Sequence, residues 1–170
     1  MKIHCELHAG VAGIVSACWS FDSRSVITES DFGIQLSIWS LLDSSCHLIS
    51  NPKQSIVRST SSAKAGHTIK LTAFSDCGRM LAVVHRIELH DHIGIFSTSP
   101  WNEISKFQCR SNDISSIQWT PNGAHLVAVD SPLTYKFLVY TPSGEVTVPF
   151  FVLRILHSLR NFKSPILNSF

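Results

Sequence analysis

The densest group of side chains that could do chemistry lies between residues 85 and 92. His85, His90, Asp91 and His92 fall within this short segment, and His90 and His92 would share one face of a strand. Imidazole and carboxylate groups bind transition metals when three or four of them converge. No second such group lies nearby in the sequence, so a polar segment between strands is the favoured interpretation and a metal site the alternative.

Other catalytic patterns are missing from the sequence. Serine, histidine and aspartate are plentiful, as a hydrolytic triad requires, but there is no Gly-x-Ser-x-Gly nucleophile elbow. Neither Gly-x-x-x-x-Gly-Lys-Ser/Thr nor Gly-x-Gly-x-x-Gly occurs, so nothing indicates a phosphate-binding loop. The chain is therefore predicted to be non-enzymatic, with no catalytic, cofactor-binding or metal-binding residue and no cofactor.

Composition argues against several further classes. Of 170 residues 44% are hydrophobic and 15% charged, which argues against a disordered chain. Fourteen Lys and Arg against twelve Asp and Glu do not suit a strongly basic nucleic-acid-binding protein. No apolar run reaches the roughly 18–20 residues of a membrane span. The five cysteines form no Cys-x-x-Cys pair, which is typical of a reduced protein of the cytoplasm or nucleus.

The elements that would carry these residues follow a repeat. Each of three copies has a strand ending in an aromatic residue, a tight turn, an apolar strand and a further strand ending in a second aromatic. The first aromatics are Trp19, Phe74 and Trp119, and the second are Trp39, Phe96 and Tyr140, spaced 44 to 57 residues apart. A period of about 40–45 residues with four short strands is typical of β-propeller blades. All six aromatics are predicted to pack between sheets.

Two of the predicted tight turns end in glycine. Gly78 and Gly123 stand where a positive φ is needed, and Pro121 presets the backbone of its turn. Ser23 stands at the matching position of the first copy, so that turn is expected to be less favourable.

The repeat predicts an all-β chain of about three four-stranded blades over residues 1–148. The blades lie at about 11–49, 68–108 and 113–148, with an inserted loop over 50–67. A basic, apolar tail over 149–170 stands outside the repeat. The last 25 residues carry Arg154, Arg160 and Lys163 without an acid, giving +3 against −1 for the rest of the chain. This change in character favours a fragment, a splice form or a gene-model artefact, with a basic amphipathic helix as the alternative.

Two further features leave alternatives open. The serine-rich loop 50–67 holds Lys53, Arg58 and Lys64, and is interpreted as a solvated loop or, alternatively, as a phosphorylation site. Trp101 follows Pro100 in a predicted loop, where packing on the fourth strand is favoured and an exposed partner contact is the alternative.

The copies resemble WD repeats, although their third strands end in Trp39-Ser40, Phe96-Ser97 and Tyr140-Thr141 rather than Trp-Asp. The stretches 13–20, 28–41 and 117–129 with 135–140 resemble the WD repeat-containing protein eight family of spindle-pole and centrosomal propellers. This resemblance implies a partial WD-repeat propeller. It also implies a non-catalytic scaffold that acts with a coiled-coil microtubule-anchoring protein, in the cytoplasm at centrosomes or spindle poles.

Other functions remain compatible with a β-repeat binding module. One is a substrate-receptor or adaptor propeller in a ubiquitin ligase or coat assembly, and another is a non-functional truncated product. The resembled family has more blades, so further blades are expected in a full-length counterpart. Uncapped repeat ends expose apolar surface, so the chain alone is expected to be marginally stable or aggregation-prone.

Overall fold

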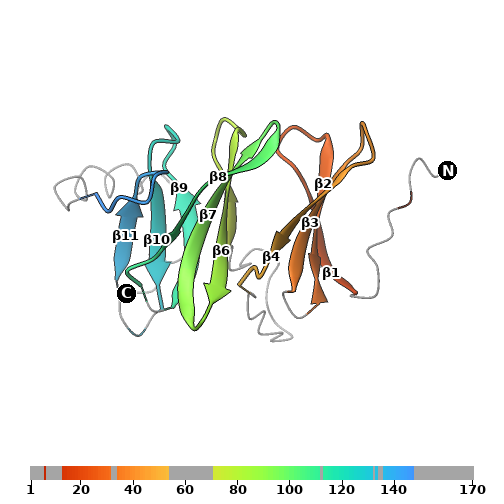
Figure 1. Ribbon diagram of the computed structural model, residues 1–170. Helices are drawn as coiled ribbons and strands as arrows, with labels where there is room; N and C mark the ends of the chain where they lie inside the picture. Colours follow the sequence, from red (N-terminus) through yellow and green to blue (C-terminus); the bar gives the residue numbers. More distant parts are fainter. Residues whose placement is uncertain are drawn as a thin grey trace, which may run out of the picture.

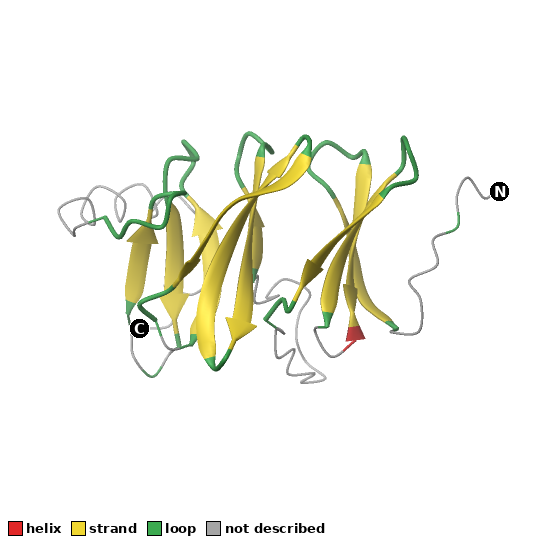
Figure 2. Cartoon of the chain, in the orientation of Figure 1, coloured by secondary structure: helices red, strands yellow, loops and turns green. Residues whose placement is uncertain are grey.

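The chain is all-β in the part that the structure describes, as the sequence predicts (Figures 1 and 2). The computed structural model describes residues 6, 13–31, 34–53, 71–111, 113–131, 133 and 136–147. Its strands are β1 (Ile14–Trp19), β2 (Ser25–Ser30), β3 (Gln35–Ser40), β4 (Cys46–Ser50), β5 (Thr72–Phe74), β6 (Met80–Ile87), β7 (His90–Thr98), β8 (Trp101–Gln108), β9 (Ile114–Trp119), β10 (Leu126–Asp130) and β11 (Phe137–Tyr140).

The strands form three antiparallel sheets that stand side by side (Figure 1). The first has the order β1-β2-β3-β4, the second β5-β6-β7-β8 and the third β11-β10-β9. After β11 the chain begins a further pairing, because Val146 bridges Tyr140 and Thr147 N donates to the carbonyl oxygen of Val139 at 2.9 Å. Three sheets of three to four strands are consistent with the predicted partial propeller.

The predicted boundaries are only partly within the described residues. Ser50, which the predicted loop 50–67 includes, ends β4. Positions 54–67 of that predicted loop lie outside the described residues, as does the predicted tail 149–170. Both sides of the undescribed segment 54–70 are held at one residue of β6. Lys53 N donates to the carbonyl oxygen of Val84 at 2.7 Å, and Val84 N donates to that of Leu71 at 2.9 Å.

The second sheet is buried on both faces. Along β6, Leu81 and Val83 pack against Ile27 and other apolar residues of the first sheet, whereas Ala82 and Val84 pack toward the third. All four β6 side chains are at most 1% exposed. Burying a valine or leucine side chain stabilises a fold by about 1.5–3 kcal/mol, so this alternation ties the three sheets together.

The first-to-second-strand turns share one hydrogen-bonding pattern. The hydroxyl oxygens of Ser20, Ser75 and Thr120 accept from the backbone N–H five residues later, at 2.9, 3.1 and 3.1 Å. Gly78 and Gly123 have φ of 69° and 67°, and Ser23 adopts the same conformation at 58°. A side chain in this region costs about 1 kcal/mol or more, so the serine turn is the strained one.

In the described part of the chain, no helix is long and apolar enough to cross a bilayer.

Candidate functional site

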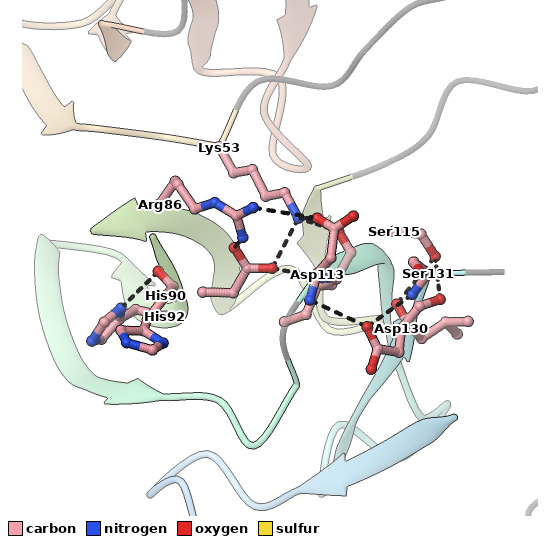
Figure 3. Close-up of polar contacts among 11 residues, drawn as sticks. Lys53, Arg86, His90, His92, Asp113, Ser115, Asp130 and Ser131 are labelled. Atoms are coloured by element: carbon pink, nitrogen blue, oxygen red, sulfur yellow. Dashed lines mark hydrogen bonds and ion pairs between the residues drawn. The ribbon is translucent and has the colours of Figure 1, made fainter. Parts of the chain in front are cut away.

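The histidines predicted as possible metal ligands do not converge. His85 lies on β6 and is 1% exposed, whereas His90 is exposed on β7 and its carbonyl oxygen lies 3.3 Å from Nδ1 of His92 (Figure 3). Among the described residues, no three His, Cys, Asp or Glu side chains are grouped so that they could hold a metal ion.

Asp91, from the same predicted group, instead forms a buried ionic network. Its carboxylate is inaccessible to solvent and accepts from Lys53 Nζ at 2.8 Å, Arg86 Nη1 at 2.5 Å and Ile114 N at 2.6 Å. Lys53 Nζ also donates to Oδ1 of Asp113 at 2.5 Å (Figure 3). Moving a carboxylate out of water costs several kcal/mol, and these three donors offset that cost.

The Asp91 network joins the second and third sheets to the segment that follows the first sheet. Arg86 belongs to β6, Ile114 begins β9, and Lys53 follows the first sheet and also donates to the carbonyl oxygen of Ile114 at 2.7 Å. Lys53 was predicted to lie in the serine-rich loop 50–67, and no local pattern indicates its ionic partner Asp91, which lies 38 residues away in the sequence. The network therefore fixes the second and third sheets to the segment that leaves the first.

A second buried carboxylate lies beside this network in the third sheet. Asp130, which is 5% exposed, accepts from Asp113 N at 3.2 Å and Ser131 N at 2.8 Å. Ser115 Oγ donates to the carbonyl oxygens of Val129 and Asp130 at 3.1 and 2.9 Å (Figure 3). These contacts hold the start of β9 against the end of β10.

His85 occupies the place in the second sheet that Asp130 occupies in the third. Its Nδ1 donates to the carbonyl oxygen of Ser50 at 3.0 Å and so joins the second sheet to the end of β4. Nε2 is buried without a hydrogen-bond partner, and a Cβ at Gly94 would approach it to 2.7 Å. Burial, with a contribution from the charge of Lys106, lowers the pKa of His85 to about 4.

The six repeat aromatics lie in three matching cross-strand rows. Directly paired residues of antiparallel strands share a face. The rows are Trp19–Val26–Trp39, Phe74–Leu81–Phe96 and Trp119–Leu126–Tyr140. The Phe74 row faces the first sheet and the Trp119 row faces the second. In each of these two sheets the first and second repeat aromatics therefore belong to the same packing surface.

Burial of the first aromatics depends on the preceding sheet. Trp119 is 4% exposed and donates from Nε1 to the carbonyl oxygen of Ala73 at 3.0 Å, and Phe74 packs against the cluster of the first sheet. Trp19 differs from the prediction, because it is 61% exposed. The described residues provide no sheet before β1, so Trp19 has nothing to pack against.

Trp101 begins β8 and is not in a loop. It is half-buried, packs against the cluster between the first and second sheets, and lines a hollow of about 270 Å³. The hollow is lined by Ile38, His47, Leu48, Ile49, Phe96, Trp101, Asn102 and Glu103. The indole therefore contributes to packing, and a partner contact there stays a prediction.

The sequence is similar to that of a WD-repeat protein. The WD repeat-containing protein WRAP73 of Mus musculus is 34% identical over 143 residues, which are 84% of this chain and 28% of that protein. No family model matches the chain. The chain thus spans less than a third of the length of this relative.

Solved structures show the propeller fold. The structure of U3-55K matches with a TM-score of 0.54 at 16% identity, covering 83% of this chain and 41% of that one. The β-propeller domain of Cps50 (Swd1) from Myceliophteria thermophila matches at 0.52 and 12%, covering 85% and 41%. The sequence match and this fold together support the resemblance of the chain to the WD-repeat family.

The WD-repeat family is generally non-catalytic. Some propellers of similar fold are nevertheless named for 6-phosphogluconolactonase or protease chains. At 14–18% identity this likeness shows the fold alone.

Proposed function

We propose that this chain contributes blades to a non-catalytic protein-interaction scaffold that acts in microtubule anchoring at spindle poles or centrosomes. The WD-repeat relative and the propeller fold support a protein-interaction scaffold in general. The resemblance of the stretches 13–20, 28–41 and 117–129 with 135–140 to spindle-pole propellers supports the narrower role.

The observation that carries the scaffold proposal is that Asp91 and His85, from the polar group at residues 85–92, are bonded inside the fold. Asp91 is fully buried and is bonded by Lys53, Arg86 and Ile114 N, so its charge holds sheets together and does not face a substrate. His85, from the same group, is bonded to the carbonyl oxygen of Ser50. These residues stabilise a rigid support on which a binding surface can lie.

The proposed partner is a coiled-coil microtubule-anchoring protein, and the proposed location is the cytoplasm with enrichment at spindle poles or centrosomes. A tagged chain in dividing cells tests both. Proximity labelling is expected to recover microtubule-anchoring proteins, and fluorescence is expected to mark the poles. An Asp91→Asn variant, which removes the charge at the centre of the network, is expected to lose both signals.

Two results would contradict this function. Recovery of ubiquitin-ligase or coat subunits without microtubule-anchoring proteins would favour an adaptor propeller. A diffuse signal with no specific partner, together with transcripts in which the repeat continues past residue 148, would favour a non-functional truncated product.

A further inference from the structure

The hollow between the first and second sheets is the size of a single side chain. It measures about 270 Å³ and is lined mainly from β4 and β8. Pockets that bury a small-molecule ligand usually measure about 300–1,000 Å³, so this hollow lies below their range. Because β4 and β8 are the last strands of their sheets, no further strand of the described chain covers the opening between them.

The hollow contains an unpaired carboxylate. Glu103 is directly opposite Phe96, whose ring packs on the cluster of the first sheet, so Glu103 lies on the face of β8 that is turned toward the first sheet. Glu103 is exposed and forms no hydrogen bond or ion pair with any residue that the structure describes. By contrast, the exposed carboxylate of Asp43 in the β3–β4 turn accepts from Ser45 Oγ at 2.8 Å.

No basic side chain of the described residues neutralises Glu103. Lys106, opposite Gly94 on the same face of β8, does not line the hollow and forms no ion pair with Glu103. His47, opposite Ile38 on β4, is the other titratable residue of the lining. The lining therefore carries one acidic residue and neither lysine nor arginine.

Two aromatic rings accompany this carboxylate. Phe96 and Trp101 both line the hollow and are half-buried. The face of an aromatic ring attracts a cation, and a carboxylate can bind a guanidinium through two parallel hydrogen bonds. Arginine suits both groups, because its planar guanidinium stacks on aromatic rings and is more weakly hydrated than the ammonium of lysine. Leu48, which is 63% exposed, adds an apolar contact beside them.

We infer that the hollow binds an arginine side chain of a partner protein. The guanidinium is bonded to the carboxylate of Glu103 and stacks on Trp101, and an apolar residue next to the arginine contacts Leu48. This inference rests on the proposed scaffold function, because a protein partner supplies the arginine. It assigns the accessible part of the Trp101 indole to the partner contact that the sequence left as an alternative.

A titration of the 170-residue chain followed by nuclear magnetic resonance tests the site. The probe is the blocked peptide acetyl-Leu-Arg-Leu-amide, and the comparison peptide has citrulline, which resembles arginine in shape but is uncharged. The arginine peptide is expected to shift the indole resonance of Trp101 and the amide resonance of Glu103. Its dissociation constant should be about 10-fold or more below that of the citrulline peptide, because hydrogen bonds between charged groups are the stronger ones.

Three variants identify the groups that bind. Glu103→Gln is expected to remove the preference for arginine over citrulline. Glu88→Gln is the matched control, since Glu88 is exposed in the β6–β7 turn, at the other end of the second sheet from Trp101. Trp101→Leu keeps an apolar side chain without the aromatic face and should weaken binding of the arginine peptide about 3-fold or more. Unchanged indole resonances of Trp39 and Trp119 establish that each variant is folded.

Four results would overturn the inference. They are equal binding of the two peptides, an unchanged preference for arginine in Glu103→Gln, the absence of any shift at millimolar peptide, and tighter binding of free arginine than of the peptide. The last would assign the hollow to a small molecule. Partner recovery in cells by the unaltered chain tests the scaffold function without reference to the hollow, so the two proposals fail separately.

Discussion

Lowering the pH from 7 to 5 should weaken the fold through His85. Its imidazole is neutral in the folded chain, because burial lowers its pKa from 6.5 to about 4. Between these values the unfolded chain binds a proton that the folded chain does not, so stability falls as the pH falls. Above pH 6.5 both states are neutral and the effect vanishes, and below about 4 both are protonated and it levels off.

The size of this effect follows from the two pKa values. A difference of one pKa unit corresponds to about 1.4 kcal/mol, and the window from pH 7 to 5 covers most but not all of the difference between 6.5 and about 4. The expected loss in free energy of unfolding is therefore about 2 kcal/mol. Small domains are stable by only about 5–15 kcal/mol, so this loss should be readily measured.

Urea unfolding of the unaltered chain and of His85→Asn at both pH values measures the effect. The asparagine amide can donate to the carbonyl oxygen of Ser50 but does not titrate, so the variant should lose about 2 kcal/mol less between pH 7 and 5. His90→Asn, at an exposed histidine nearby, should keep the dependence of the unaltered chain. Equal pH dependence in the unaltered chain and His85→Asn would refute the argument.

Three further perturbations test the network and the turns. Asp91→Asn should cost about 1.5–3 kcal/mol in urea unfolding, because it removes the buried charge that accepts hydrogen bonds from Lys53 and Arg86, whereas Asp113→Asn at a 56% exposed side chain should cost about 1 kcal/mol or less. Equal losses would contradict this role. Cys77, whose pKa is lowered to about 7 chiefly by a hydrogen bond from Arg79, should react with iodoacetamide at pH 7 faster than Cys46, an exposed residue whose thiol pKa is raised by partial desolvation. Peptide mass spectrometry measures both rates, and equal rates would count against the contact with Arg79. Ser23→Gly should raise the unfolding free energy by about 1 kcal/mol by relieving a φ of 58°, and an unchanged value would show that the turn is not strained.

The strands and turns could be predicted because their signals are local. Short apolar runs between turn residues fix the strands, and glycine marks the positive φ at Gly78 and Gly123. The turn hydroxyls could also have been predicted from the sequence. Ser20, Ser75 and Thr120 each directly follow the first aromatic residue of a copy.

The contacts between distant segments could not be predicted. Spacing makes Trp19 and Trp119 equivalent, but their burial depends on whether a sheet lies before them. Asp91 stands beside histidines in the sequence, yet its partners come from Lys53 and from the backbone of Ile114, which only the assembled sheets bring together. A group of ligand-type residues therefore indicates a polar site without saying whether it serves catalysis or packing.

The shared attachment of Lys53 and Leu71 to Val84 has a consequence for how this chain can change. Since the segment 54–70 leaves and returns at one residue of β6, its length places no demand on the distance between the sheets. Closing a loop costs only about 0.6 kcal/mol more for each doubling of its length. The lineage of this protein can thus lengthen, shorten or replace the segment at little cost, and a reporter domain could be inserted there while the propeller geometry is kept.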